Sequence, residues 1–303
     1  MAKISGSKRL QDVNAFHVMS LMAEAKQLEA EGHRVIHMEM GEPDFSTPQP
    51  IIDAGIESLQ SGFTHYTPTL GLPALREAIA NFYLTEYHVT VEPAQIVITP
   101  GSATALQLAL TLMVSDGDSV AIPDPAYPST HNLVRLLGGK VLHIPVNEDS
   151  SWQLTIELLE QYWNEAVKAV LLASPSNPTG TLLDNEQLQK IADFCESKGV
   201  FLLVDEIYHG LVYEGSPKTA VGINHNTFVI NSFSKFYGMT GWRVGWIVAP
   251  KPYLAELNKL AQHTFLAAPT PGQYAALAAF KPETRKILLK RRDEYKMRRD
   301  YLY

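Results

Sequence analysis

The chain has 303 residues, of which 46% are hydrophobic and 19% are charged, a composition typical of a folded globular protein. Its formal net charge of −7 argues against a nucleic-acid-binding protein, which normally carries a basic surface. The single cysteine, Cys195, excludes an intramolecular disulfide and fits a reducing compartment. It lies in an apolar stretch, which favours a buried thiol over a nucleophile.

The N-terminal region carries no apolar run of the signal-peptide type, and residues 15–31 are predicted to form an amphipathic helix. The best apolar run, at residues 169–173, has the length of a strand and not of a membrane span. We therefore expect a cytoplasmic protein that contacts neither membrane nor nucleic acid.

Short β-rich runs alternate with helical stretches between Pro93 and Pro250. Several runs are apolar throughout, as expected for strands covered on both faces. The alternation predicts a three-layer α/β/α fold around a mostly parallel sheet. The predicted strands are residues 96–99, 119–122, 140–144, 167–173, 200–204, 228–231 and 244–249, and the predicted helices include residues 102–114, 155–166 and 185–197.

The helix predicted at residues 185–197 has clear end signals. Asp184 stands at its N-cap position with Gln187 three residues further on, and Gly199 follows its end. A further helix is predicted to begin near Pro282, where a proline suits the first turn. It continues to the last residue without a stop signal.

Polar clusters follow four of the predicted strands. Ligands of parallel α/β sheets bind beyond the carboxyl ends of the strands, so these clusters are expected to lie together. The clusters are Gly101-Ser102-Ala103-Thr104, Ser176-Asn177-Pro178-Thr179-Gly180, Asp205-Glu206-Ile207-Tyr208 and Ser232-Phe233-Ser234-Lys235.

Two of the clusters carry side chains suited to covalent and acid–base chemistry. Lys235 lies among apolar and aromatic residues, where desolvation would lower its pKa and make the amine a nucleophile able to form a Schiff base. Asp205 follows a buried strand, and a carboxylate there needs a positive partner. That partner is either an arginine of the fold or a protonated heterocycle such as a pyridinium.

An anion site is predicted from a third cluster. Small residues that open a helix at Gly101 let backbone N–H groups approach an anion, and Arg243 could clamp a phosphate. Hydroxyls of Ser102 and Thr104 could add donors. An ordinary helix cap made by one of these two hydroxyls is the alternative.

In combination, the motifs resemble those of class I/II aminotransferases, fold-type I pyridoxal-phosphate enzymes similar to aspartate aminotransferase. The resemblance runs from about residue 41 to residue 250. It is carried, in chain order, by Gly41-Glu42-Pro43-Asp44-Phe45, Tyr66, Gly101-Ser102, Pro123-Asp124-Pro125-Ala126-Tyr127-Pro128, Asn177-Pro178-Thr179-Gly180, Asp205-Glu206-Ile207-Tyr208, Ser232-Phe233-Ser234-Lys235 and Gly241-Trp242-Arg243.

The resemblance implies pyridoxal 5′-phosphate as cofactor, with Lys235, Asp205 and Tyr208 as catalytic residues. Lys235 would hold the cofactor as a Schiff base and move the α-proton of the substrate. Asp205 would pair with the ring nitrogen, and Tyr208 and Asn177 would hydrogen-bond the ring oxygen. Tyr127 would stack on the ring face.

The remaining roles implied by the resemblance concern the phosphate, the substrate and the partner subunit. Gly41 and Asn177 would contact the substrate, and Tyr66 would reach the phosphate of the neighbouring subunit in a homodimer. The expected phosphate ligands of the same subunit are Ser102, Ala103, Ser232, Ser234 and Arg243.

The resemblance also divides the chain. Residues 1–45 would belong to a small domain, residues 46–281 would form the large cofactor-binding domain, and residues 282–303 would begin a long helix leading to an absent C-terminal domain. In the family that domain carries an arginine for the substrate α-carboxylate. Neither Arg298 nor Arg299 is assigned this role, since both lie in the charged helical pattern. We therefore expect a complete cofactor site and impaired turnover.

Three functions fit these motifs: an aminotransferase acting on an L-amino acid and a 2-oxo acid, a carbon–sulfur β-lyase with the same cofactor, and a non-catalytic fragment that binds the cofactor. A nicotinamide-dependent enzyme is excluded because no Gly-x-Gly-x-x-Gly follows the first strand. The ten histidines show no metal-ligand spacing, so no metal site is predicted.

Overall fold

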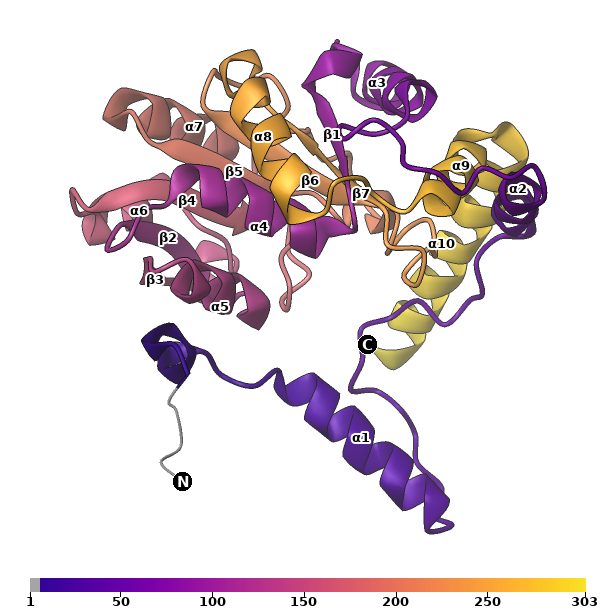
Figure 1. The fold of residues 1–303 in the computed structure, drawn as a ribbon. Helices are drawn as coiled ribbons and strands as arrows, with labels where there is room; N and C mark the ends of the chain where they lie inside the picture. The colour runs from indigo at the N-terminus through magenta and orange to yellow at the C-terminus, as the bar shows by residue number, and fades with distance from the viewer. Residues whose placement is uncertain (1–5) are drawn as a thin grey trace, which may run out of the picture.

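The computed structural model describes residues 6–303, and within these residues helices and strands alternate over most of the chain (Figure 1). The strands are β1 (Ile96–Thr99), β2 (Ser119–Asp124), β3 (Lys140–Pro145), β4 (Val167–Ala173), β5 (Phe201–Asp205), β6 (Thr227–Ser232) and β7 (Gly245–Val248). The α-helices are α1 (His17–Ala30), α2 (Gln49–Gln60), α3 (Pro73–Tyr87), α4 (Ser102–Met113), α5 (Pro128–Leu136), α6 (Ile156–Tyr162), α7 (Asn185–Lys198), α8 (Leu254–Thr264), α9 (Thr270–Leu277) and α10 (Pro282–Leu302).

Among the described residues the strands form one seven-stranded sheet in the order β1-β7-β6-β5-β4-β2-β3. The neighbours from β6 to β3 are parallel, and β7 runs antiparallel to both β1 and β6. The sheet is therefore mostly parallel, as predicted, and each predicted strand is confirmed to within two residues at either end.

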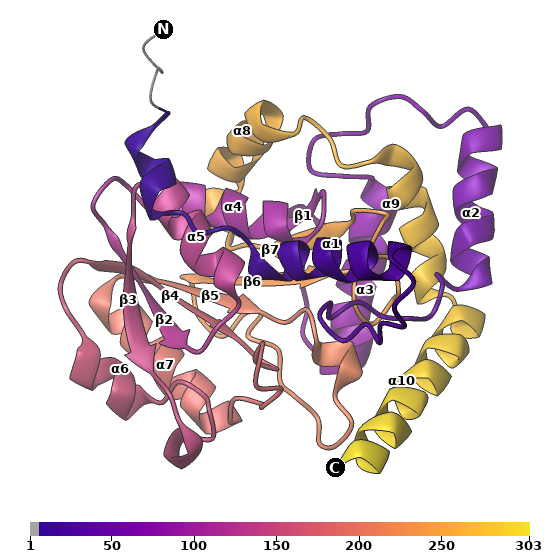
Figure 2. The same cartoon turned by 90° about the horizontal axis from the view of Figure 1, so that it is seen from below.

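Helices cover both faces of the sheet, and side chains of successive strand residues enter two different cores. In β5, Leu202 and Val204 belong to one core and Leu203 to the other. One core packs under α2, α3, α7 and α9, and the other under α4, α5 and α8 (Figure 2). This confirms the predicted three-layer fold, since only strands covered on both faces can be apolar throughout.

Two helices differ from the expectations in detail. The helix predicted at residues 155–166 ends at Tyr162, because Trp163 is extended and the side chain of Asn164 accepts a hydrogen bond from the N–H of Ala166 (3.0 Å). Asp184 caps α7 as predicted. Gln187, however, does not complete a capping box, since its side chain accepts from the N–H of Ile156 (3.0 Å).

Cys195 lies on the inner side of α7. Its thiol is buried, and burial raises its pKa to about 12. A thiol with this pKa is protonated and inert at neutral pH, so the expectation of a buried, structural cysteine is confirmed.

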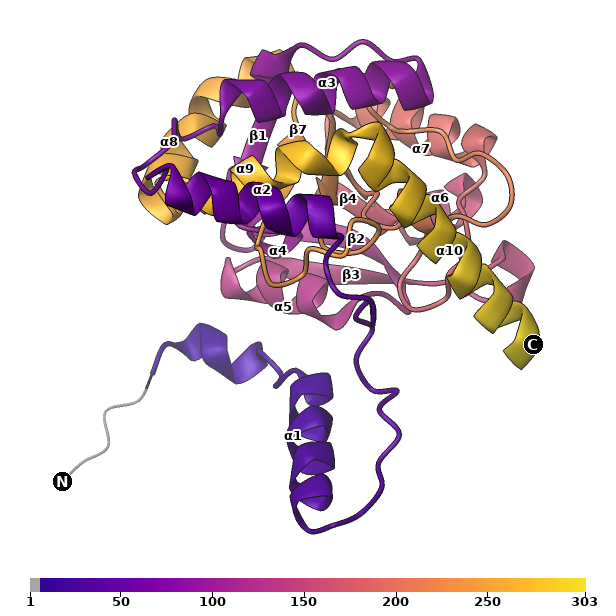
Figure 3. The ribbon, with the colours of Figure 1, turned by 90° about the vertical axis from the view of Figure 1, so that its right-hand side faces the viewer.

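The two terminal helices pack less than the others. Helix α1 has no buried residue and extends away from the sheet and its helices (Figure 3). Helix α10 buries Thr284 and Leu288 near its start. Further along it, Arg298 pairs with Asp44 (2.7 Å) and Arg299 with Glu214 (2.9 Å). The domain boundaries at residues 45 and 281 stay predictions.

No helix within residues 6–303 is both long enough and apolar enough to cross a membrane.

A buried aromatic contact between β7 and α3 can be tested. Trp246 of β7 donates its indole N–H to the hydroxyl of Tyr83 on α3 (3.1 Å), and both side chains are fully buried. We expect Tyr83→Phe to lower the free energy of unfolding by about 1–3 kcal/mol, because a buried donor loses its acceptor.

Chemical denaturation of the purified chain measures this loss. Tyr301→Phe removes the same hydroxyl from a side chain that is 90% exposed, and it should change the stability by less than about 0.5 kcal/mol. Equal effects of the two substitutions would contradict the assignment.

Candidate active site

The polar clusters lie at one edge of the sheet, beyond the carboxyl ends of β1, β4, β5 and β6. The strand pairing places Asp205 beside Ala173 and Ile230, so the segments that lead to Asn177 and Lys235 start next to it. The segment after β1 reaches the same edge because β7 links β1 and β6. This edge is where parallel α/β sheets bind their ligands.

Lys235 lies in the turn that follows β6, with a partly buried side chain. Its Nζ atom donates to the carbonyl oxygen of Gly41 (2.6 Å) and lies 6.0 Å from the centre of the Tyr208 ring. Burial lowers the pKa of this amine, and the negative charges of Glu42 and Asp205 partly oppose the shift. The amine is thus more easily deprotonated than a surface lysine, as its sequence context predicts.

Asp205 ends β5, and its carboxylate accepts a hydrogen bond from the N–H of Ile207 (3.1 Å). Burial raises the pKa of this carboxyl to about 6, although the Ile207 hydrogen bond and the charge of Lys235 act in the opposite direction. Among the described residues, no arginine forms an ion pair with Asp205. The interpretation of Asp205 as the partner of a structural arginine is therefore wrong.

Tyr208 and Asn177 come from adjacent strand ends and contact each other, with the Asn177 amide donating to the Tyr208 hydroxyl (3.3 Å). Burial raises the pKa of Tyr208 to about 12, and the nearby Asp205 and Tyr127 add to the shift. The hydroxyl is therefore a donor at neutral pH. The ring of Tyr127 meets Phe16 edge to face, with centroids 6.0 Å apart.

The start of α4 forms a cradle with Arg243. Gly101 is the N-cap residue with φ of +80°, and a Cβ atom built on it would lie 2.4 Å from Nη2 of Arg243. The Arg243 guanidinium donates to the carbonyl of Thr240 (3.0 Å) and has no carboxylate partner among residues 6–303. The first N–H groups of α4, at Ser102 and Ala103, follow the glycine that Arg243 contacts, and backbone N–H groups with a guanidinium are the donor set that a phosphate requires.

The helix-cap interpretation of Ser102 and Thr104 is wrong, because the cap residue is Gly101. No side chain caps α4, and the Thr104 hydroxyl donates instead to the carbonyl of Pro100 (3.2 Å). A positive φ at the cap suits glycine, and this keeps the first turn of α4 open.

Ser232 and Ser234 are both buried, and their Oγ atoms lie 2.9 Å apart. Ser232 Oγ also accepts from the N–H of Ser234 (3.1 Å) and contacts the carbonyl of Val244 (3.1 Å). The two serines are thus at the predicted edge, but their hydroxyls bond to each other and to the backbone.

Tyr66 is separate from the other candidates. Its ring is 82% exposed, and none of the contacts within the described residues joins it to the cluster around Lys235. Gly41, in contrast, lies beside the turn after β6. The segment that contains it is held there by Thr47, which donates to the carbonyl of Gly238 (2.7 Å), and by a hydrogen bond from Thr240 to Glu42.

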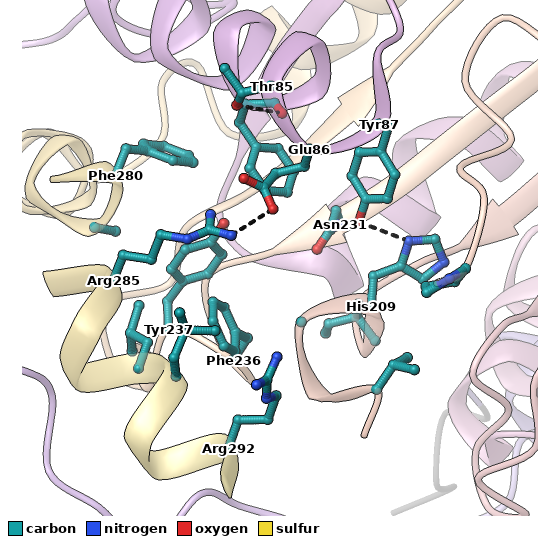
Figure 4. A pocket seen from close by; sticks show the side chains of 18 of the residues that line it. Thr85, Glu86, Tyr87, His209, Asn231, Phe236, Tyr237, Phe280, Arg285 and Arg292 are labelled. Atoms are coloured by element: carbon teal, nitrogen blue, oxygen red, sulfur yellow. Dashed lines mark hydrogen bonds and ion pairs between the residues drawn. The ribbon is translucent and has the colours of Figure 1, made fainter. Parts of the chain in front are cut away.

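Sequence reasoning gave no role to Glu42, Glu206 or His209. Glu42 and Glu206 lie inside the motifs named above, but the contact of Glu42 with Thr240 joins segments far apart in the chain, and the contact of Glu206 with Thr219 joins the end of β5 to the loop before β6. His209 lines a cavity of about 290 Å³ between α3, α10 and the segment after β5, apart from the residues around Lys235 (Figure 4). The Arg285–Glu86 ion pair (2.7 Å) crosses this cavity.

Comparison with known proteins identifies the family. Residues 33–303 match the model of aminotransferase class I and II. A (5-formylfuran-3-yl)methyl phosphate transaminase of Methanocaldococcus jannaschii is 43% identical over 97% of this chain and 77% of its own length. A probable aspartate/prephenate aminotransferase of Aquifex aeolicus is 35% identical over 97% of this chain and 76% of its own length.

Solved structures agree. An aminotransferase from Mycobacterium tuberculosis superposes with a TM-score of 0.94 at 34% identity, covering 98% of this chain and 77% of that one. The aspartate aminotransferase of Thermus thermophilus with maleate superposes with a TM-score of 0.94 at 29% identity, covering 98% of this chain and 79% of that one.

The chain therefore belongs to the class I and II aminotransferases, enzymes of fold type I that transfer amino groups with pyridoxal 5′-phosphate. The aminotransferase prediction is confirmed, and the β-lyase alternative is not favoured. The residues fit this cofactor. The cradle at Gly101, which a Cβ atom would fill, suits its phosphate, and the buried Asp205 suits its ring nitrogen.

The cradle can be tested with a matched pair of glycines. Gly101→Ala would push away the Arg243 guanidinium, whereas Gly117→Ala places a methyl group in open space at a similar φ of +88°. Both substitutions should cost about 1 kcal/mol of stability through backbone strain. Only Gly101→Ala should raise the dissociation constant for pyridoxal 5′-phosphate, by about tenfold or more. Equal cofactor affinities in a fluorescence titration would contradict the cradle.

Asp205 should lower the stability of the cofactor-free chain. Its pKa in the folded chain, about 6, exceeds its ordinary value of 3.8, so the folded chain binds the proton more tightly and loses stability as pH rises through this interval. At pH 8, Asp205→Asn should raise the free energy of unfolding by about 1–2 kcal/mol while weakening cofactor function.

Urea denaturation at pH 4, 6 and 8 measures this effect. Asp116→Asn, a change at an exposed residue, is the matched control and should leave the pH dependence unaltered. A loss of stability in Asp205→Asn at pH 8 would show that the buried carboxylate is not a cost to the fold.

Proposed function

We propose that Lys235, Asp205 and Tyr208 are the catalytic residues with which this aminotransferase moves an amino group between an L-amino acid and a 2-oxo acid. The observation that carries the proposal is the position of the Lys235 amine, which is partly buried, has a lowered pKa and faces the Tyr208 ring at 6.0 Å. A nucleophilic amine at this edge of the sheet suits covalent attachment of the cofactor.

When bound, pyridoxal 5′-phosphate supplies an electron sink for the charge that develops at the substrate α-carbon. Lys235 takes the proton from that carbon with its Nζ atom, for which a depressed pKa is an advantage near neutral pH. The contact of Nζ with the Gly41 carbonyl (2.6 Å) supports a substrate position beside these two residues. Asn177 would bind the substrate from the opposite segment.

Asp205 would pair with the protonated ring nitrogen in a buried place, where such an ion pair is strong. Tyr208 would donate a hydrogen bond to the ring oxygen, and the Asn177 amide holds the Tyr208 hydroxyl in place from 3.3 Å. Tyr127 would pack on the ring face. The closeness of Tyr127 and Asp205 to Tyr208 supports one shared binding place for these side chains.

The phosphate is held by the N–H groups of Ser102 and Ala103 and by the guanidinium of Arg243. Ser232 and Ser234 lie at the end of β6 and in the turn after it. Their hydroxyls, which bond to each other, are further donors to the phosphate. The open cradle at Gly101 supports this assignment, because a phosphate oxygen fits where a side chain does not.

We further propose a cytoplasmic homodimer in which Tyr66 reaches the phosphate of the neighbouring subunit. The 82% exposure of Tyr66 and its separation from the other site residues support a role across an interface. Large apolar side chains exposed on α1, among them Met19 and Leu21, support a covered position of that helix in the assembly.

Lys235→Ala tests the proposal. The chain loaded with pyridoxal 5′-phosphate should show a visible absorption band that Lys235→Ala lacks and that Lys259→Ala, an exposed lysine on α8, retains. Aspartate, valine, glutamate and aromatic amino acids are then added one at a time. With a substrate among them, the band should be lost as the cofactor becomes pyridoxamine phosphate. Release of ammonia and pyruvate would indicate a β-lyase, and a band that persists in a folded Lys235→Ala variant would refute the proposal.

A further inference from the structure

Glu206 follows Asp205 directly, but its carboxyl group lies on the other side of the chain. Asp205 accepts from Ile207 at the cofactor edge, whereas Glu206 is 1% exposed and bonds to the segment that precedes β6. Its oxygens accept from the N–H of Ala220 (2.6 Å) and from the hydroxyl of Thr219 (2.8 Å). Two consecutive carboxyl groups thus lie in two different environments, one at the cofactor edge of the sheet and one against the segment before β6.

The contact with Thr219 continues into the backbone of a loop. The Thr219 hydroxyl accepts from the N–H of Val221 (3.2 Å) while it donates to Glu206. Ala220 and Val221 are buried in the core beside α7. Glu206 therefore connects the end of β5 to a loop that is anchored in the core.

His209 extends the network toward α3. Its Nδ1 atom lies 3.1 Å from the hydroxyl of Tyr87 (Figure 4). The same atom lies 3.5 Å from an oxygen of Glu206, and the ring lies near the backbone of Ser174. Ser174 itself donates its N–H to the carbonyl of Asp205 (3.1 Å). The network thus holds the exits of β4 and β5, which lead to Asn177 and Tyr208.

The network is uncharged near neutral pH. Burial raises the pKa of Glu206 to about 8, with a further contribution from Asp205, and lowers the pKa of His209 to about 4. The other titratable groups facing Glu206 are Tyr83 and Tyr87 of α3, whose pKa values burial raises. Of the two consecutive carboxyl groups at the end of β5, Asp205 is therefore the one that carries a negative charge.

We propose that Glu206 is a positioning residue of the amino-transfer site: with Thr219, Ala220 and His209 it fixes the turn from Asp205 to Tyr208 from behind. This inference rests on the proposed roles of Asp205 and Tyr208. A neutral acid suits this place, because it accepts the Ala220 hydrogen bond without adding a second charge beside Asp205.

Glu206→Gln and Glu206→Ala in the full chain loaded with pyridoxal 5′-phosphate test the proposal. Glutamine keeps the acceptor and the neutral charge, so cofactor affinity and the pH midpoint of the lysine-dependent band should stay within about twofold and 0.3 pH units of the parent. Alanine should weaken cofactor affinity by about tenfold and shift the midpoint by about half a unit or more.

Thr219→Val is the second variant, for use where Glu206→Ala does not fold. It removes one donor to Glu206 and should weaken cofactor affinity by about threefold. Its control is Thr227→Val, which removes a buried hydroxyl at the far end of β6 that donates to Asn224 (2.7 Å). This change should cost stability but leave affinity and midpoint unaltered.

The positioning role would be overturned if folded Glu206→Ala or Thr219→Val had the cofactor affinity and pH midpoint of the parent. It would also be overturned if Glu206→Gln lost as much cofactor affinity as Glu206→Ala. Failure of the proposed function looks different: the parent chain itself would then show no lysine-dependent band.

Discussion

The site depends on one feature of the sheet, which is the antiparallel strand β7 between β1 and β6. Its first residue, Gly245, pairs with Thr99 of β1 and with Ser232 of β6. The carboxyl ends of β1 and β6 and the start of β7 are thereby held next to one another. A Cβ atom on Gly245 would lie 2.8 Å from the backbone of Gly101, so the approach is possible because this residue is glycine.

That junction explains why one cradle can be built from segments more than a hundred residues apart. Arg243 precedes Gly245 and so lies against Gly101, while Lys235 follows Ser232 in the adjacent turn. The amine, the guanidinium and the first N–H groups of α4 are held by strand pairing. Strand pairing is rigid, and a rigid frame keeps the two ends of a phosphorylated aromatic cofactor at a fixed separation.

Burial of charged groups is the second property of the site. Asp205 and Lys235 both have pKa values displaced toward the neutral form, and they lie close enough to influence each other. Such groups destabilise a folded chain unless a ligand pairs with them. A cofactor with a cationic ring nitrogen and a carbonyl carbon for the amine meets both needs, so cofactor binding and folding stability are expected to be linked.

Much of the fold follows from the sequence, because strands covered on both faces give continuous apolar runs such as residues 169–173 and 201–204. The identity of the helix cap does not follow, since it depends on the φ of +80° at Gly101 and on the distant Arg243, which leaves no room for a Cβ atom there. The end of α6 at Tyr162 was also missed, because Trp163 turns to pack against Phe194 (4.9 Å between centroids).

Among the site residues, those following strands were predictable, since each sits beside a hydrophobic run that fixes its place. Glu206 and His209 were not, because Thr219 lies in an irregular loop without a sequence pattern and Tyr87 is distant from His209 in the chain.

The most direct measurement is chemical mapping of the lysine that binds the cofactor. The chain would be loaded with pyridoxal 5′-phosphate, reduced with borohydride, digested and analysed by mass spectrometry, with the unloaded chain treated in parallel. The account predicts that the reduced adduct is on Lys235 at one equivalent per chain. An adduct concentrated on another lysine, or spread over many with Lys235 unmodified, would contradict it.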